Sequence, residues 1–180
     1  MWSIAGTLPA LELADHPELL ADPVRAALSE EQAARCALVR IDPDLADTAQ
    51  FCAAYESPPA ASANCVVVSG KRGGMVRLAA CMVLATTRAE VNTVVRKRLD
   101  VRKASFAPMA EVVAASGMAY GGITPIGLPA DWPVYVDPAV AQSAELVIGS
   151  GIRGSKLLVP GELLAGLPTA EVLAGLGVAA

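Results

Sequence analysis

The stretch NCVVVSGKRGGMVRLAACMVLA, residues 64–85, decides the fold class. It begins with the β-branched run Asn64–Ser69, passes through Lys71-Arg72-Gly73-Gly74 and continues as the apolar run Met75–Ala85. Two such runs joined by a short segment that contains glycine are typical of a β-hairpin. The stretch therefore predicts two neighbouring antiparallel strands with their turn at residues 71–74.

On both sides of this hairpin, helical and extended patterns alternate. Aspartate followed by proline favours a helix start at Asp22 and at Asp42, and Glu90 before Arg96–Arg98 suits the dipole of the next helix. Mixed strands and helices predict an α+β fold with a mixed, largely antiparallel sheet. We expect helices at residues 22–35, 42–55, 87–99, 108–115, 160–167 and 169–176, and further strands at residues 36–41, 104–106, 134–136, 144–148 and 156–159.

The length and composition of the chain fit one domain. It has 180 residues, of which 54% are hydrophobic and 18% are charged, so it can bury a large core. Residues 1–23 are acidic and contain proline, so we expect an N-terminal arm there and a single domain over residues 24–180. The longest apolar runs are too short to span a bilayer, and the first residues lack a secretory signal pattern. We expect a cytoplasmic protein that has no contact with membranes.

The cysteines and the histidine argue against metal chemistry. Cys36, Cys52, Cys65 and Cys81 are far apart in the sequence, and His16 is the only histidine. Zinc sites need clustered Cys or His ligands, so we expect no metal and no cofactor. Buried free thiols are the simple interpretation of the cysteines. A serine triad is not available, and a Cys–His catalytic pair would depend on the remote His16.

Charge is distributed unevenly along the chain. Residues 1–56 have a balance of −7, residues 71–103 have +7 from nine basic and two acidic residues, and residues 104–180 have −4. A basic segment in an acidic protein is typical of a phosphate-binding face, and Arg96, Arg98 and Lys103 are candidates for it. A solvated helix surface is the alternative that the pattern leaves open.

Two glycine-rich clusters are the best indication of function. Residues 116–127 read SGMAYGGITPIG, and residues 149–156 read GSGIRGSK. Glycine allows a backbone to approach a ligand closely, so the two loops predict a pocket lined by N–H groups that suit an oxyanion or a phosphate. The second cluster formally matches a dinucleotide fingerprint, but no long helix opens at Gly154. A turn between strands is therefore expected, either plain or facing an anion or ribose with Arg153 at its tip.

Asp137 lies between the two clusters, directly after an apolar strand and before Pro138. One interpretation is a carboxylate that faces the pocket from the end of a strand. The other is the N-cap of a short helix at residues 138–142, because Asp-Pro often starts helices. No second carboxylate is near in the sequence, so the paired acids of a glycosidase are unsupported.

Residues from about Ala37 to Leu167 resemble the YbaK/ProX family, the prolyl-tRNA synthetase-associated editing domain. The resemblance rests on Ser116-Gly117, Gly121–Gly127, Val136-Asp137 and Gly149–Gly154, in this order and at this spacing. It implies a mixed, barrel-like sheet surrounded by helices, and hydrolysis of a mischarged aminoacyl-tRNA ester in trans. As partners it implies the 3′ acceptor end of an aminoacyl-tRNA and an aminoacyl-tRNA synthetase.

The resemblance also implies how the residues act. Catalysis would depend on positioning: glycine-loop N–H groups hold the carbonyl oxygen, and the hydroxyl of the terminal adenosine or a group of the substrate assists the attack. The family usually has a lysine where this chain has Asn64, which donates a hydrogen bond without charge, so Lys103 is the candidate replacement. Catalytic roles are expected for Gly121, Gly122, Thr124, Asp137 and Asn64, and substrate binding for Lys103, Ser116, Pro125, Gly149, Ser150, Gly151, Arg153, Arg96 and Arg98.

Two other functions stay open at this point. One is a tRNA- or synthetase-binding module without catalysis, which Asn64 in place of lysine favours. The other is a hydrolase of another small acyl ester. Walls rich in alanine and glycine favour a small amino acid, Ala, Ser, Cys or Pro, as the substrate group. The sequence does not define the oligomeric state.

Overall fold

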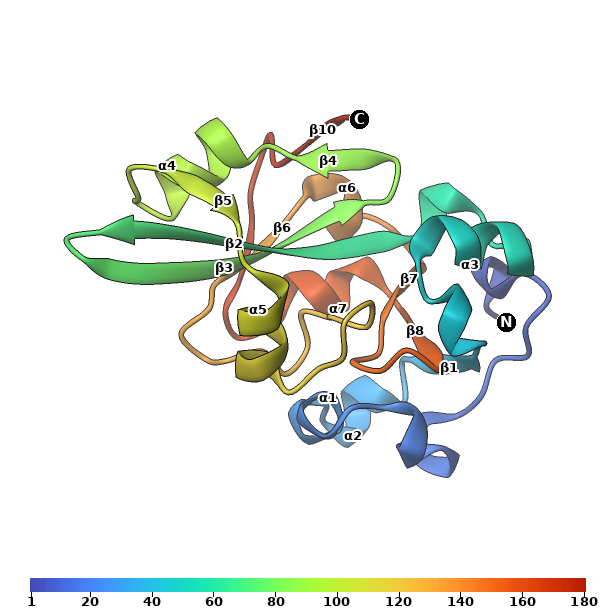
Figure 1. The fold of residues 1–180 in the computed structure, drawn as a ribbon. Helices are drawn as coiled ribbons and strands as arrows, with labels where there is room; N and C mark the ends of the chain where they lie inside the picture. Colours follow the sequence, from blue (N-terminus) through green and yellow to red (C-terminus); the bar gives the residue numbers. More distant parts are fainter.

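The hairpin predicted at residues 64–85 forms the centre of the structure. In the computed structural model, which describes residues 1–180, β2 (Ala63–Arg72) and β3 (Met75–Leu84) pair antiparallel over their full lengths (Figure 1). Gly73 and Gly74 make the turn, with φ values of 56° and 80°. A tight hairpin turn requires positive φ at both central residues, which glycine adopts without steric cost. The predicted hairpin is confirmed.

A five-stranded mixed sheet is built around this hairpin, in the order β5-β2-β3-β6-β9. β5 (Ala104–Phe106) runs antiparallel to β2. β6 (Val134–Val136) runs parallel to β3, and β9 (Ala170–Val172) runs parallel to β6. A small antiparallel sheet pairs β4 (Thr87–Ala89) with β10 (Gly177–Ala179), next to the C-terminus (Figure 1).

A separate antiparallel sheet has the order β1-β8-β7. Its strands are β1 (Ala37–Arg40), β7 (Leu146–Gly149) and β8 (Ser155–Val159). An isolated parallel bridge joins Ser62, just before β2, to Val147 of β7, so the start of the hairpin lies against this second sheet. The α+β class with mixed, largely antiparallel pairing is confirmed, and the strands form three sheets instead of one closed barrel.

Short helices surround the sheets. The helix expected at residues 22–35 is divided in two, because Ser29 caps a new start: its hydroxyl accepts from Gln32 N–H, and the Gln32 side chain accepts from Ser29 N–H. This reciprocal capping box defines a helix N-terminus. The α-helices are α1 (Asp22–Ala27), α2 (Glu30–Ala33), α3 (Thr48–Tyr55), α4 (Arg96–Arg98), α5 (Met109–Ser116), α6 (Pro138–Ala141) and α7 (Gly161–Ala165).

The helix predicted at residues 87–99 is confirmed only from Val91 onward, the helix predicted at residues 169–176 is wrong, and strand pairing explains both differences. Residues 87–99 begin as β4, which pairs with β10, and continue as a π-helical turn at Val91–Val95 before α4. Residues 169–176 contain β9, which extends the large sheet beside β6. Both pairings depend on partners that are remote in the sequence, and such tertiary contacts override local propensity.

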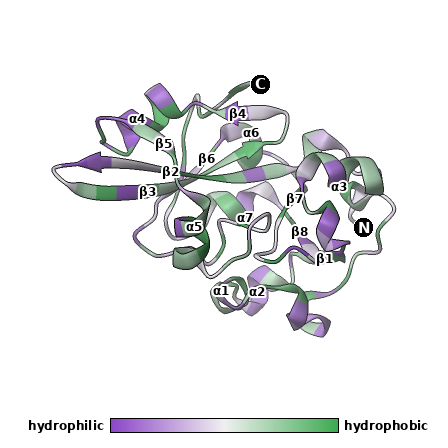
Figure 2. Ribbon diagram, viewed as in Figure 1, coloured by the Kyte–Doolittle hydropathy of each residue, from purple (hydrophilic) through white to green (hydrophobic).

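The N-terminal residues pack against the domain. Leu11 forms a bridge with Leu38 of β1, and Leu13 and Leu19 belong to the largest hydrophobic core cluster, which contains 21 buried residues. Hydrophilic residues gather at the outer end of β2 and around α4, whereas β3 begins at the same end of the hairpin with hydrophobic residues (Figure 2). No helix combines the length and the hydrophobicity needed to cross a membrane.

Candidate functional site

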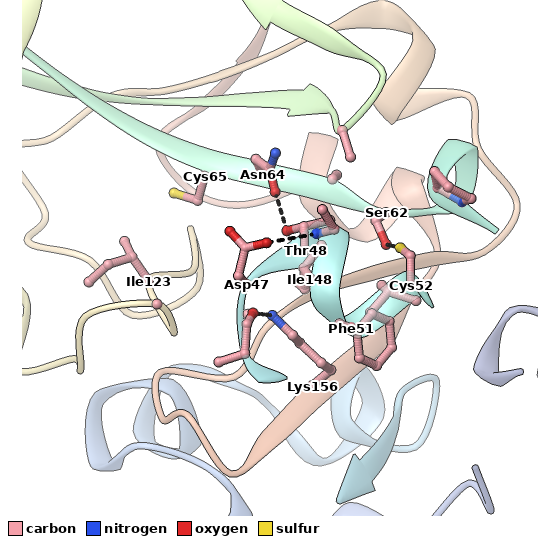
Figure 3. A pocket seen from close by; sticks show the side chains of 18 of the residues that line it. Asp47, Thr48, Phe51, Cys52, Ser62, Asn64, Cys65, Ile123, Ile148 and Lys156 are labelled. Atoms are coloured by element: carbon pink, nitrogen blue, oxygen red, sulfur yellow. Dashed lines mark hydrogen bonds between the residues drawn. The ribbon is translucent and has the colours of Figure 1, made fainter. Parts of the chain in front are cut away.

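A cavity of about 750 Å³ lies where the two larger sheets meet (Figure 3). Its walls come from the start of β2, from α3 and the loop before it, from the end of β7 and the start of β8, and from the loop at residues 120–123. Asp47 and Lys156 are the only charged residues among those that line it. A mostly apolar cavity with a few polar groups is the usual form of a small-ligand site.

The beginning of α3 places polar groups at this cavity. Asp47 is the N-cap of α3, and its Oδ1 accepts hydrogen bonds from the N–H groups of Ala49 (3.0 Å) and Gln50 (3.3 Å). Thr48 Oγ1 donates to Oδ1 of Asn64 at 2.8 Å and so links α3 to β2. Asp47 Oδ2 and Asn64 Nδ2 make no hydrogen bond within the protein, which leaves one acceptor and one donor free for a ligand.

Lys156 reaches the cavity from the other sheet, as the second residue of β8 (Figure 3). The residue is only 7% exposed, its Nζ donates to the Ala46 carbonyl at 2.6 Å, and Nζ lies 5.7 Å from the centroid of the Phe51 ring. Burial lowers the pKa of Lys156 from 10.5 to about 8, and the nearby negative charge of Asp47 opposes this shift. Because an ammonium has three N–H donors, two are left for a ligand.

The structure brings the two glycine-rich clusters into direct contact. Gly151 N–H donates to the Gly122 carbonyl at 2.7 Å. A Cβ on Gly122 would lie 2.7 Å from the Ile152 carbonyl oxygen, and one on Gly149 would lie 2.6 Å from the carbonyl oxygens of Gly122 and Ile123. Any side chain would therefore separate the loops, so close packing explains both glycines.

The N–H groups predicted as donors in the loop at residues 120–123 divide into two groups. Gly121 and Ile123 line the cavity, and their N–H groups make no hydrogen bond within the protein. Gly122 does not line it, and its N–H donates to the Ala119 carbonyl at 2.9 Å. The expectation that the Gly122 N–H faces the cavity is thus replaced: the available donors belong to Gly121 and Ile123.

Several of the expected site residues lie behind the loops instead of on the cavity wall. Thr124 is fully buried, and its Oγ1 has no hydrogen-bond partner. Ser116 Oγ accepts from Met118 N–H at 3.2 Å, and Ser150 Oγ lies 2.7 Å from Ser155 Oγ. Pro125 and Gly151 are buried as well, and none of these five residues lines the cavity.

Asp137 does not line the cavity, which corrects the expectation that its carboxylate faces the pocket from the end of a strand. It is the N-cap of α6, where its Oδ2 accepts from Ala139 N–H at 3.1 Å. Its Oδ1 accepts from Gly177 N–H at 2.8 Å and ties α6 to β10. The Asp-Pro pair therefore has the structural role that the sequence left open, because both carboxylate oxygens bind backbone N–H groups.

Of the predicted basic residues, only Arg153 lies next to the cavity. Its Nη1 donates to the Tyr120 carbonyl at 3.1 Å, and its guanidinium lies 5.9 Å from the centroid of the Tyr120 ring. A Cβ on Gly121 would lie 2.5 Å from Arg153 Nη1, so Arg153 covers the loop closely. Tyr120 itself lines the cavity, which places an aromatic ring and a cation together at its edge.

The other predicted cations lie elsewhere. Arg98 pairs with Glu171 at 2.6 Å, and both side chains are substantially exposed to solvent. Arg96 Nε donates to the Asn92 carbonyl at 2.7 Å, and Lys103 is exposed. None of the three basic residues lines the cavity.

Lys156 and Asp47 line the cavity but were not among the residues expected there. Lys156 had a signal in the sequence, since it is the only charged residue in the buried strand Ser155–Val159, and a buried lysine needs a reason. Asp47 was hidden because the helix start was expected at Asp42. In the structure, residues 43–45 form a 3-10 turn, and Asp47 begins α3.

Three of the four cysteine thiols, those of Cys36, Cys65 and Cys81, are unsuited to nucleophilic attack. Burial raises the pKa of Cys36 to about 11 and that of Cys81 to about 12. Burial and the neighbouring Cys81 also raise the pKa of Cys65, which lines the cavity. These thiols stay protonated at neutral pH, whereas the thiolate is the nucleophile.

Solved structures confirm the fold. A putative trans-editing enzyme for prolyl tRNA synthetase superposes with a TM-score of 0.69 at 18% identity, covering 85% of this chain and 95% of the other. Hypothetical protein APE2540 gives 0.68 at 18% identity, over 78% and 90% of the two chains. A scaffold protein from a study of epitope backbone grafting gives 0.71 at 18% identity, over 89% and 97%. At this identity the likeness concerns the fold alone.

Sequence comparison identifies the family. A search of curated proteins found no match. The family model described as the aminoacyl-tRNA editing domain matches residues 42–167, which is more than half of the chain. Every residue that lines the cavity falls within this range. The chain therefore belongs to the aminoacyl-tRNA editing domain family.

Proposed function

We propose that this protein is a trans-editing hydrolase that removes a small amino acid from a mischarged tRNA. Aminoacyl-tRNA editing domains are generally deacylases. The observation that carries the proposal is the cavity at residues 46–156, because it lies entirely within the matched region 42–167 and contains one buried lysine, one free carboxylate oxygen and unpaired loop N–H groups.

The size of the cavity supports a substrate larger than a free amino acid. About 750 Å³ falls within the range of roughly 300–1,000 Å³ that is usual for small-ligand sites. We assign it to the amino acid together with the nucleoside at the 3′ end of the tRNA. The wall contains Ala46, Ala49, Ala53, Ala63 and Ala85, and the aminoacyl group in this proposal is Ala, Ser, Cys or Pro.

The reaction in this proposal is ester hydrolysis without a protein nucleophile. Water adds to the ester carbonyl carbon, the carbonyl oxygen becomes an oxyanion, and the bond to the ribose oxygen then breaks. The products are the free amino acid and a tRNA with its hydroxyl restored. The protein contributes by stabilising the oxyanion and by holding the ester in place for attack.

Named groups supply these effects. The N–H groups of Gly121 and Ile123 and the ammonium of Lys156 are the donors for the oxyanion, because each has unused hydrogen-bonding capacity at the cavity. The free carboxylate oxygen of Asp47 binds the α-ammonium of the aminoacyl group. Nδ2 of Asn64 donates to the terminal ribose. Where the bound substrate excludes water, such charged hydrogen bonds are stronger than in solution.

The direct test is a panel of tRNAs mischarged with Ala, Ser, Cys or Pro, together with one charged with Phe as a large control. We expect the purified protein to release one of the small amino acids faster than spontaneous hydrolysis does, and to leave the Phe ester intact. Binding of tRNA without release of any amino acid would contradict the proposal and support a non-catalytic module. If the protein hydrolyses other small acyl esters and tRNA does not inhibit this activity, the result would support the alternative of a hydrolase for another small acyl ester.

A further inference from the structure

A second, smaller cavity continues from the first. Its volume is about 250 Å³, and four of the eight residues that line it, Cys65, Val66, Met109 and Ile123, also line the first cavity. Cys65 and Ile123 lie at the end of the first cavity that is remote from Phe51 and Cys52 (Figure 3). The two cavities therefore form one groove that leaves the candidate site along β2.

Exposed large side chains follow this groove. Tyr120 is 63% exposed and lines the first cavity, Met109 is 42% exposed and lines both, and Phe106 is 65% exposed and lines the second. Only seven large hydrophobic residues of the chain are exposed to this degree, and three of them lie along this one groove. Hydrophobic residues exposed singly need no explanation, whereas a contiguous set of them marks an interaction site.

A positive charge lies beside one of the exposed rings, that of Tyr120. The guanidinium of Arg153 lies over Tyr120 at 5.9 Å from the ring centroid. All eight residues that line the second cavity are hydrophobic, so its wall carries no charge of either sign. Aromatic platforms with neighbouring cations are the features that proteins use to hold single-stranded nucleic acid.

The geometry points to this groove as the track for the unpaired nucleotides next to the aminoacylated end of the tRNA, with bases stacked on Tyr120 and Phe106 and packed against Met109. This inference rests on the proposed function, since the esterified nucleoside would occupy the first cavity. Phe106 pairs with Val68, four residues along β2 from Asn64, which corresponds to about 14 Å of strand. The groove thus extends far enough from the cavity to hold a few nucleotides.

Binding of uncharged RNA tests the groove independently of hydrolysis. The probe is a fluorescently labelled, unpaired oligoribonucleotide with the 3′-terminal sequence of tRNA, and the comparison is a blunt RNA hairpin without unpaired nucleotides. We expect Tyr120→Ala and Phe106→Ala each to weaken binding of the unpaired probe by about 5- to 100-fold, the cost of losing one stacked base. Tyr120→Phe keeps the ring and is expected to bind like the unchanged protein.

Two controls make this test specific. Met75→Ala removes an equally exposed hydrophobic side chain from the tip of the hairpin, away from the groove, and is expected to leave binding unchanged. Phe106→Leu keeps an apolar side chain but removes the ring, so we expect it to lose affinity as Phe106→Ala does. Both groove residues are exposed, so their variants are expected to fold, which thermal unfolding checks.

The outcomes separate this inference from the proposed function. If Tyr120→Ala and Phe106→Ala bind the unpaired probe as tightly as the unchanged protein does, the groove does not hold unpaired nucleotides. The same conclusion follows if these variants lose as much affinity for the blunt hairpin as for the unpaired probe. In either case, deacylation by the unchanged protein would still support the proposed function. Affinity that depends on Tyr120 and Phe106 would support the groove even if no mischarged tRNA were hydrolysed, and the proposed function would then fail alone.

Discussion

The two ends of the β2–β3 hairpin differ in how they carry charge. The outer end is exposed and basic, and there Arg72 and Arg77 both contact the carboxylate of Asp100, at 2.6 and 3.3 Å. The inner end is apolar, and there the single cation is Lys156, buried against Phe51. Exposed ion pairs contribute little free energy, whereas a desolvated charge acts strongly on whatever is bound beside it. The high number of basic residues in the segment 71–103 therefore does not show where the candidate site lies.

The largest effect is expected at the buried cation. Lys156→Met replaces the ammonium with an apolar chain of similar volume, and loss of one oxyanion donor usually reduces turnover by about 100- to 1,000-fold. We expect such a loss in deacylation of the preferred mischarged tRNA. Removal of the desolvated charge offsets the loss of the hydrogen bond to the Ala46 carbonyl, so the variant should stay folded, which thermal unfolding checks. The matched control is Lys71→Met at the exposed end, which should deacylate normally. If Lys156→Met and Lys71→Met deacylate the tRNA at equal rates, the buried cation has no greater effect on the reaction than an exposed one.

The pH dependence sharpens the same contrast. The pKa of Lys156 is lowered to about 8, chiefly by burial, so the ammonium loses its proton as the pH rises through this value. The enzymatic rate, after subtraction of spontaneous hydrolysis, should therefore fall above about pH 8. Because the unfolded chain keeps the proton up to about 10.5, the contribution of Lys156 makes stability rise with pH between these values, and Lys156→Met should abolish this rise.

The next effect concerns the contact between the glycine loops. In Gly122→Ala the new Cβ would lie 2.7 Å from the Ile152 carbonyl oxygen, which is backbone and cannot yield easily. We expect a loss of about 1–3 kcal/mol in the free energy of unfolding, as for other overpacked sites, measured by urea denaturation. Gly154→Ala is the control, because its nearest neighbour would be 4.0 Å away. If Gly122→Ala has the same free energy of unfolding as the unchanged protein, the two glycine-rich loops can move apart without loss of stability.

A smaller effect is expected at Asp137. Asp137→Ala removes the cap of α6 and the partner of Gly177 N–H, so we expect a loss of about 1–2 kcal/mol in stability. Deacylation at a temperature where the variant is folded should be unchanged, because Asp137 does not line the cavity. If the variant is folded but its turnover is strongly reduced, the carboxylate of Asp137 has a role in the reaction and not only in capping α6.

The smallest effect is expected in the basic segment. Arg98 is engaged by Glu171, and Arg96 by the Asn92 carbonyl, in a part of the fold that does not line the cavity. Arg96→Ala combined with Arg98→Ala should leave tRNA affinity and its salt dependence nearly unchanged. If instead the slope of log affinity against log salt falls by about 0.7 for each residue, both residues contact phosphates on a single strand.

Local chemistry predicted much of the fold. The hairpin was predictable because two glycines supply the positive φ of its turn, and the β-branched run before them favours extended backbone. The short strand at Val134–Val136 was predictable for a similar reason, and the structure has it at those residues. The start of the helix expected at residues 87–99 and the whole helix expected at residues 169–176 are not helical, because β4 and β9 pair with strands that are remote in the sequence.

The candidate site was only partly predictable. Glycine clusters predicted a shared pocket, and the structure places Gly121 and Gly149 on one cavity, but loop packing explains Gly122 and Gly149 as well as any ligand does. The sequence cannot show which N–H groups are already used within the protein, which decides between Gly121 and Gly122. Nor can it show that β8 lies beside α3, which is what makes Lys156 a residue of the cavity.

The contact between Lys156 and Ala46 also determines the order in which the parts of the cavity come together during synthesis of the protein. These residues are 110 positions apart, so a chain that emerges from the ribosome already contains α3 and the hairpin while the cavity still lacks its cation. Closing a loop of this length has an entropic cost, which the pairing of β8 with β1 and β7 helps to compensate. The candidate site is therefore completed late, because a nascent chain lacks Lys156 until β8 has been made.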